Sequence, residues 1–407
     1  MMTGASNPAA AEAPGPGQPV RQGPRPLAMH LLMATALWRS SLPGSTGSNS
    51  ASAPWNPADG AEPPPSRAAL EAEIDRRRAE FLAGVRLYRQ HPGPALRPHR
   101  PVVWSRGSSR LLDLGGAGPP LLLVPSLVNR WDILDFAPDR SFAGRLAEQV
   151  GRCLVLDWGE PGEDESGFTL SDYIVDRLEA ALEVTATHLG GPPVLVGYCM
   201  GGLLALASAV RRPSAVRGLM LLATPWDFHA VPGQQAFGRT ALAALGPSLD
   251  LLGHLPVDAL QSLFLLADPF GVVNKFRRAP VLRGRALEDF VRLEDWLNDG
   301  VRLTAPVARE CLGGWYGRNS TARGQWRVAG RPLAPATLDC PACVVVPRTD
   351  RLVPPASALP LAARLPGASL LQPTIGHVGM MASPRAPAAV WPPMVEWLRR
   401  SPRRVDA

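Results

Sequence analysis

From residue 101 onward, short apolar runs alternate with longer amphipathic segments. Short runs bounded by Gly, Pro or Asp are typical of buried strands, whereas apolar residues repeating every three or four positions indicate helices. The predicted strands cover residues 102–104, 111–114, 121–124, 153–157, 194–196, 218–223, 344–346 and 369–371, and the predicted helices 141–150, 169–189, 203–207 and 391–399. This alternation predicts an α/β fold with a mostly parallel, doubly wound sheet.

The alternation stops between about residues 226 and 306. The apolar segments there are short and separated by Pro or Gly, and they cover residues 241–245, 249–255, 260–266 and 287–297. We interpret 226–306 as a helical cap inserted between two parts of the core, 101–225 and 307–401. A cap would control substrate access and exclude water from the site.

The first 65 residues are rich in Pro, Gly, Ala and Ser and are predicted to form a disordered or partly helical arm. Within this arm, residues 26–38 are apolar but too few to span a bilayer. We expect a short helix there that docks on its own domain, with a partner or a hydrophobic granule surface as alternatives. Residues 66–100 are predicted to contain an amphipathic helix over 67–90 and a linker.

The segment 192–207 carries the strongest chemical signal. It consists of an apolar run, then Gly-Tyr-Cys-Met-Gly-Gly, then an Ala- and Leu-rich run, and it predicts a strand, a sharp turn and a helix. This is the nucleophile elbow of the α/β-hydrolase fold with Cys199 at the tip. Gly197, Gly201 and Gly202 would let the strand and helix approach closely. The alternative is a buried, inert cysteine.

The partners of Cys199 are expected later in the chain, each after a strand, with the acid before the histidine. Asp350 follows the strand at 344–346, and His377 lies in a Gly-His-Val-Gly sequence after the strand at 369–371. Alone, each is better explained as an ordinary loop residue. Together, in this order, they predict a Cys-His-Asp triad.

An oxyanion site should use the backbone N–H of Met200 and a second N–H from the loop after the strand at 121–124. Because Pro125 has no N–H, we expect Ser126 or Leu127 to donate.

Composition narrows the function classes. The chain has 407 residues, and its net charge of +7 comes almost entirely from arginine, with Lys275 as the only lysine. The arginines form no basic stripe, and the sequence has no motif typical of nucleic-acid binding, although the positive charge could attract an anionic coenzyme A substrate.

Five cysteines form no disulfide framework and indicate a reducing, cytoplasmic compartment. The Cys340-Pro-Ala-Cys343 pair lacks a second ligand pair, so no metal is expected.

Several motifs together resemble the polyhydroxyalkanoate synthase family, an α/β-hydrolase relative that uses cysteine where most use serine. They are the loop 125–136, the segment 157–159, the elbow, the segment 224–228, the loop 350–354 and the segment 376–379. The resemblance implies Cys199 as acyl-carrying nucleophile, His377 as base and Asp350 as its partner. It covers residues from about 100 to 400.

The resemblance implies an acyltransferase that polymerises 3-hydroxyacyl-coenzyme A through a Cys199 thioester. No cofactor is implied beyond this substrate. A granule surface, a homodimer or a second synthase subunit is the expected partner, and Asn129, Trp226 and Trp296 are candidate pocket residues. The alternatives are a cysteine-dependent thioesterase or polyester depolymerase, and a non-catalytic granule-associated protein.

Overall fold

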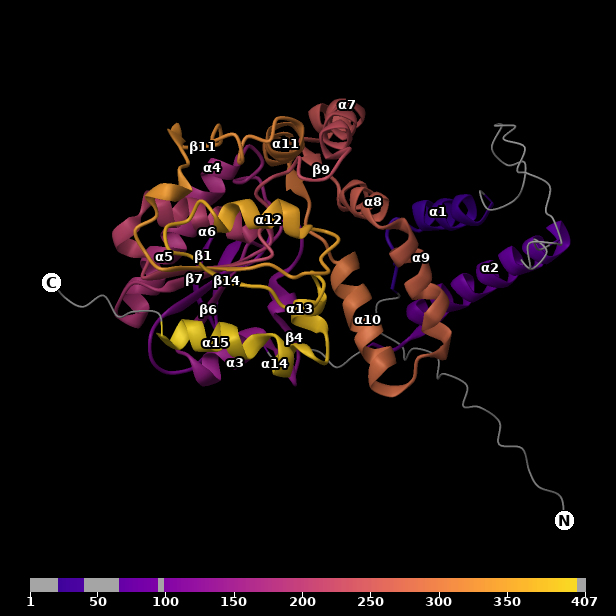
Figure 1. Ribbon diagram of the computed structural model, residues 1–407, viewed down its shortest axis with the longest axis horizontal. Coiled ribbons are helices and arrows are strands. Elements are labelled where there is room, and N and C mark those ends of the chain that lie inside the picture. Colours follow the sequence, from indigo (N-terminus) through magenta and orange to yellow (C-terminus); the bar gives the residue numbers. More distant parts are fainter. Residues whose placement is uncertain (1–20, 40–65, 94–98, 401–407) are drawn as a thin grey trace, which may run out of the picture. The chain divides into compact units, whose positions relative to one another are not determined.

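The computed structural model describes residues 21–39, 66–93 and 99–400 (Figure 1). The chain divides into two compact units. The helical unit comprises Met1–Leu96 and Gln261–Asn298, and the α/β unit comprises Arg97–Leu260 and Asp299–Ala407. The two units are defined by contacts in space, so each combines separate parts of the chain. The sequence instead predicts consecutive segments: an arm (1–65), a helix with a linker (66–100) and a cap (226–306) between two parts of the core. Residues 1–20 and 40–65 of the predicted arm lie outside the described residues.

The α/β unit is built on an eight-stranded sheet with the order β1-β2-β6-β3-β7-β8-β13-β14. β1 and β2 form an antiparallel hairpin, β2 pairs antiparallel with β6, and the remaining neighbours are parallel. The strands are β1 (Val102–Arg106), β2 (Ser109–Asp113), β3 (Leu121–Val124), β6 (Cys153–Asp157), β7 (Val194–Tyr198), β8 (Gly218–Leu222), β13 (Ala342–Val345) and β14 (Ser369–Leu371).

Helices cover both faces of this sheet. Every residue of β3, β6, β7, β8 and β13 is buried, as expected for parallel strands sandwiched between helices. One face carries α3 (Phe142–Gln149), α14 (Ala386–Ala389) and α15 (Trp391–Arg400), and the other carries α5 (Glu179–Leu189), α6 (Met200–Arg211) and α12 (Pro355–Ala362) (Figure 1). The predicted doubly wound α/β fold is therefore confirmed.

The helix predicted over 169–189 forms in three parts. Thr169 and Asp172 make a reciprocal capping box at the start of α4 (Leu170–Asp172), a π-helical segment η3 (Tyr173–Leu178) follows, and α5 ends at Gly190 with φ 75°. The first turn is stable because both partners satisfy otherwise unpaired N–H groups.

The apolar segments 241–245 and 249–255 are not separated by a break at Gly246-Pro247 in the structure. The structure has a continuous helix, α7 (Gln234–Leu252), with Pro247 in its interior. A proline inside a helix costs about 3 kcal/mol. We attribute the tolerance of Pro247 to the packing of α7 on η6 (Glu310–Gly317), which offsets this cost. Around it lie β9 (His254–Leu255), β10 (Leu303–Thr304) and α11 (Ala305–Arg309).

Short elements complete the α/β unit. They are η2 (Trp131–Leu134), β4 (Asp135–Ala137), β5 (Arg140–Ser141), η4 (Pro213–Ala215), β11 (Arg327–Val328), β12 (Arg331–Pro332), η7 (Pro335–Thr337) and α13 (Gly379–Ala382). The boundary between the units falls within α8 (Val257–Ala267).

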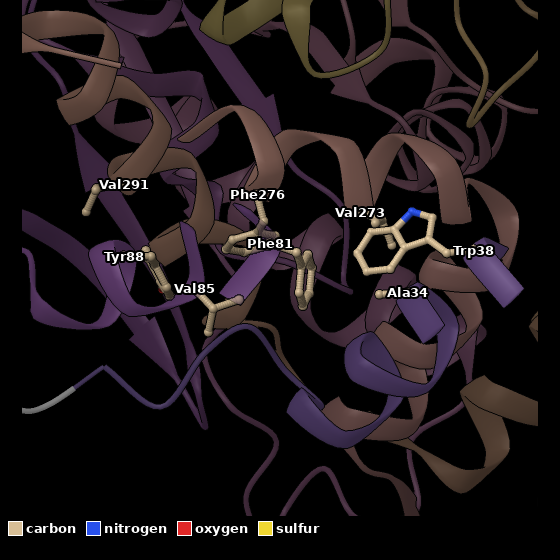
Figure 2. Close-up of a cluster of buried hydrophobic side chains, with 8 residues drawn as sticks. All are labelled: Ala34, Trp38, Phe81, Val85, Tyr88, Val273, Phe276 and Val291. Carbon is tan, nitrogen blue, oxygen red and sulfur yellow. The ribbon is translucent and has the colours of Figure 1, made fainter. Parts of the chain in front are cut away.

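In the helical unit, the N-terminal segments fold together with part of the predicted cap. It contains α1 (Leu27–Arg39), α2 (Arg67–Gln90), α9 (Pro269–Arg278), η5 (Ala279–Val281) and α10 (Gly284–Asn298). Figure 2 shows the shared apolar cluster, which consists of Ala34, Trp38, Phe81, Val85, Tyr88, Val273, Phe276 and Val291. At Gly84, a Cβ atom would lie 1.9 Å from the carbonyl oxygen of Phe276, so only glycine lets α2 and α9 meet this closely.

Polar contacts also join the segments of the helical unit. Arg21 makes hydrogen bonds of 2.7 Å and 3.0 Å to the two carboxylate oxygens of Asp295. The ammonium of Lys275 lies 2.6 Å from the buried carboxylate of Glu294. None of the helices in the described part of the chain is long and apolar enough to cross a membrane.

Candidate active site

Cys199 sits at a strained turn between β7 and α6. Its backbone has φ 55° and ψ −125°, a combination that residues other than glycine rarely adopt. Its N–H donates to the carbonyl of Leu222 in the neighbouring β8 at 2.8 Å, which ties the turn to the sheet. Strain of this kind, held by the surrounding structure, is concentrated at functional sites. The side chain is half-buried, at the N-terminus of α6.

Three glycines make this turn sterically possible. A Cβ atom on Gly197 would lie 2.5 Å from the Cα of Gly202, and one on Gly202 would lie 1.9 Å from Oγ1 of Thr224. A Cβ atom on Gly201 would lie 2.2 Å from the carbonyl oxygen of Val124, at the end of β3. A side chain at any of these three positions would therefore clash with a neighbouring element.

Asp350 and His377 meet at the ends of β13 and β14. The Nδ1 atom of His377 lies 2.7 Å from Oδ2 of Asp350, and both residues are buried. The other oxygen, Oδ1, accepts hydrogen bonds from the backbone N–H groups of Leu352 at 2.9 Å and Val353 at 2.8 Å. The loop therefore holds the carboxylate with one oxygen turned to the imidazole.

His377 also forms a hydrogen bond with Cys199. Burial acts to lower the pKa of His377, but the charge on Cys199 and the hydrogen bonds to Asp350 and Cys199 outweigh it and raise the pKa to about 10. The ring packs against Tyr198, with centroids 5.2 Å apart. The structure thus brings together the three residues of the predicted triad.

The predicted oxyanion loop lies against the first turn of α6. The contact of Gly201 with Val124 and Pro125 puts this loop next to Met200, the first residue of the helix. Trp158 donates its indole N–H to the carbonyl of Pro125 at 2.9 Å. N–H groups at the start of a helix have no acceptor within it, so the roles of Met200, Ser126 and Leu127 stay predictions that this arrangement allows.

The candidate pocket residues differ in their surroundings. The side-chain nitrogen of Asn129 is buried and has no hydrogen-bond partner among the described residues, which is a costly state unless a ligand supplies an acceptor. Trp226 is only 1% exposed. Trp296 belongs to α10 in the helical unit. Their roles in binding stay predictions.

No motif in the sequence marks Tyr316 in η6, whose phenol is influenced by the charge on Cys199. Burial, and then the charge on Cys199, raise the pKa of this phenol well above its usual value. A neighbouring network fixes the end of η6: Asn319 donates to Asp227 at 2.8 Å and accepts from the N–H of Phe228 at 3.0 Å. A tyrosine among glycines, with no neighbouring motif, offers no signal in the sequence alone.

Three of the other four cysteines have a raised thiol pKa. Cys153, Cys340 and Cys343 are buried, and Cys311 is half-buried. Burial raises the pKa of Cys343 to about 12 and raises those of Cys153 and Cys311 further, which disfavours their thiolates. In the part of the chain that the structure describes, no cluster of three or more His, Cys, Asp or Glu side chains could hold a metal ion.

Comparison with known proteins agrees with this architecture. Residues 119–384 match the family model described as alpha/beta hydrolase fold. Among curated proteins, the chain is 30% identical over 285 residues to the poly(3-hydroxyalkanoate) polymerase subunit PhaC of Haloferax mediterranei, which is 68% of this chain and 58% of that relative. It is 29% identical over 286 residues to the subunit of the same name from Thiocystis violacea, covering 69% of this chain and 80% of that one.

The chain spans only 58% and 60% of the length of the first two curated relatives, from Haloferax mediterranei and Haloarcula marismortui.

Among solved structures, an esterase from Thermogutta terrifontis is 22% identical with a TM-score of 0.45, covering 75% of this chain and 99% of that one. A thioesterase domain from the curacin biosynthetic pathway is 17% identical with a TM-score of 0.45, covering 74% and 99%.

Proposed function

Because the chain belongs to the α/β hydrolase fold family, we propose that Cys199, His377 and Asp350 are its catalytic triad. We further propose that it is an acyltransferase that polymerises 3-hydroxyacyl-coenzyme A and releases coenzyme A. One observation carries this proposal: a cysteine at a strained elbow shares a hydrogen bond with a histidine that Asp350 holds at 2.7 Å. The similarity to curated polymerase subunits supports the choice of substrate.

In the proposed first step, the Cys199 sulfur attacks the thioester carbonyl of the substrate. The N–H of Met200, with that of Ser126 or Leu127, would stabilise the negative oxygen that develops. The new carbon–sulfur bond to Cys199 forms and the bond to coenzyme A breaks. His377 gives its proton to the departing sulfur, which leaves a neutral imidazole.

In the proposed second step, the hydroxyl of another 3-hydroxyacyl group attacks the Cys199 thioester. His377 takes the hydroxyl proton, the new carbon–oxygen bond forms and the bond to Cys199 breaks. The cysteine sulfur and the protonated imidazole are restored, so the cycle balances. If water attacks instead, the product is a free acid, which is the outcome expected of a thioesterase or depolymerase.

The proposal is tested with 3-hydroxybutyryl-coenzyme A as substrate. Coenzyme A release, insoluble polymer and free 3-hydroxybutyrate are measured together for the wild-type chain and for Cys199→Ala. Cys311→Ala is a matched control, because it removes the other cysteine that is half-buried. We expect polymer from the wild type and the control, and no coenzyme A release from Cys199→Ala.

Two other results would change the assignment. Coenzyme A release with free acid and no polymer would identify a hydrolase. No release from the wild type, with Cys199 alkylated no faster than Cys311, would identify a non-catalytic protein. The same proposal places the chain in the cytoplasm, at the surface of the polyester that it makes, as a homodimer or with a second synthase subunit.

A further inference from the structure

Tyr198 is the last residue of β7 and directly precedes the nucleophile. It is paired in register with Leu222 of β8, and the next residue, Cys199, donates its N–H to the carbonyl of the same Leu222 at 2.8 Å. The side chain of Tyr198 is only 2% exposed. Burial, together with the charges on Cys199 and Asp350, raises the pKa of the phenol well above its usual value. Tyr198 is therefore a neutral hydrogen-bond donor whose backbone is fixed to the sheet.

The Tyr198 side chain contacts His377 at two points. Its ring packs against the imidazole, with centroids 5.2 Å apart and the two planes inclined at 39°. Its hydroxyl donates a buried hydrogen bond of 3.4 Å to the backbone carbonyl of His377. One side chain from the strand of the nucleophile therefore contacts both the ring and the main chain of the proposed base.

The Tyr198 hydroxyl complements the backbone hydrogen bonds at the start of α13. The carbonyls on either side of His377, those of Gly376 and Val378, accept from backbone N–H groups of α13 at 2.9–3.0 Å. The His377 carbonyl between them accepts from Tyr198. Because a buried carbonyl without a partner is costly, the hydroxyl stabilises the conformation of the loop that carries the imidazole.

This contact matters because β7 and β14 are not neighbours in the sheet. β8 and β13 lie between them, so the two strands are three spacings apart, or about 14 Å. Cys199 follows β7 and His377 follows β14, yet the two side chains share a hydrogen bond. The loop after β14 must therefore fold back across the end of the sheet, and Tyr198 holds it there from the strand of the nucleophile.

Building on the proposed function, we propose that Tyr198 is a positioning residue that sets the separation between His377 and Cys199. Its hydroxyl ties the backbone of the histidine loop to the end of β7, while its ring packs against the imidazole. Asp350 orients the ring through Nδ1, whereas Tyr198 determines how closely the ring approaches the sulfur. Tyr198 keeps its proton, and none of its bonds forms or breaks in either step.

The test is the rate at which iodoacetamide alkylates Cys199, measured at one pH by mass spectrometry of the peptide that carries it. This reaction needs no coenzyme A substrate, and it is sensitive to His377 because a neighbouring histidine activates a cysteine. We expect His377→Ala to slow alkylation most. Tyr198→Phe removes the hydroxyl and keeps the ring, and it should slow alkylation about three- to fivefold, as expected for the loss of about one neutral hydrogen bond.

A double-mutant cycle separates positioning from a general structural effect. In the His377→Ala background, Tyr198→Phe should have no further effect, because Tyr198 acts through the imidazole. A disturbance of the elbow itself would slow alkylation equally in both backgrounds. Tyr173→Phe is the matched control, since it removes the hydroxyl of another buried tyrosine of the α/β unit, and it should leave the rate near that of the wild type. Thermal unfolding should show that all variants are folded.

Unchanged alkylation in Tyr198→Phe, or an equal loss in both backgrounds, would overturn this inference and leave the proposed triad intact. If His377→Ala did not slow alkylation, the proposed triad would fail, and this inference with it. A wild-type chain that releases no coenzyme A from 3-hydroxybutyryl-coenzyme A would overturn the proposed activity alone, since the alkylation rates do not depend on that substrate.

Discussion

His377 and Asp350 form a directed pair, in which Nδ1 of the imidazole lies 2.7 Å from Oδ2 of the carboxylate. The orientation comes from the loop, because Oδ1 of Asp350 is already occupied by two backbone N–H groups. A carboxylate bound in this way cannot rotate without losing those bonds. The imidazole also makes a hydrogen bond with Cys199.

The first prediction concerns Asp350→Asn. An amide at this position can present its NH₂ group to the ring and no longer supports a protonated imidazole, so the rate of coenzyme A release should fall by roughly 10²–10⁴-fold. Steady-state kinetics measure the effect. Asp164→Asn, at an exposed position, is the control, and a loss of less than about threefold at Asp350 would contradict the proposed role.

The second prediction concerns the protonation of His377. The charge on Cys199 is the largest contribution that raises the pKa of this ring to about 10. In Cys199→Ala, burial should act with less opposition and the pKa of His377 should fall. Ring signals followed by NMR from pH 5 to 11 measure the shift, with the exposed His188 as a reference that should not change between variants.

The third prediction is a pH dependence of stability. Burial raises the pKa of Glu310 to about 7 from the usual 4.5, against a hydrogen bond from the N–H of Leu170, and Asp172 adds to the rise. Between these two pH values the folded state binds more protons than the unfolded state. The contribution of Glu310 to stability is therefore full below about pH 4.5 and is lost as the pH rises through 7.

Glu310→Gln removes the charge and keeps an acceptor oxygen for Leu170. We expect it to raise the free energy of unfolding at pH 8 by more than at pH 5, as measured by urea denaturation. Glu148→Gln makes the same change at an exposed position and should show no such difference. An equal effect of Glu310→Gln at both pH values would rule out this account.

The fourth prediction concerns the helical unit. Phe276 is fully buried and its ring contacts those of Phe81 at 5.8 Å and Tyr88 at 6.2 Å. Phe276→Ala should therefore destabilise the unit by about 3–5 kcal/mol. Phe270→Ala, at a site 61% exposed, is a control with the same chemical change. Hydrogen exchange of α2 and α9 should report local unfolding in the first variant and not in the second.

Much of the α/β unit could be predicted because its signals are local. The run Cys153–Leu156 is apolar and ends at Asp157, and it forms β6 with the predicted bounds. Cys199, Asp350 and His377 could be chosen as candidates because glycines and strand ends mark them in the sequence. The continuation of α7 through Pro247 was missed, since its packing against η6 involves residues far along the chain.

Tyr316 and the helical unit illustrate the other limit. An amphipathic pattern showed that residues 67–90 have an apolar face, but not that Gly84 and Phe276 would meet on it. Likewise, no feature near Tyr316 in the sequence indicates that its hydroxyl lies within range of the charge on Cys199.

The sequence by itself determined the order of strands and helices along the chain, the sharp turn at Cys199 and the choice of this residue as the candidate nucleophile, because these depend on propensity, steric freedom and neighbouring residues. Only the tertiary structure decided which surfaces pair, how Asp350 orients His377, and that His377 makes a hydrogen bond with Cys199. Those relationships join residues distant in sequence, and they follow from the packing of whole elements rather than from any local pattern.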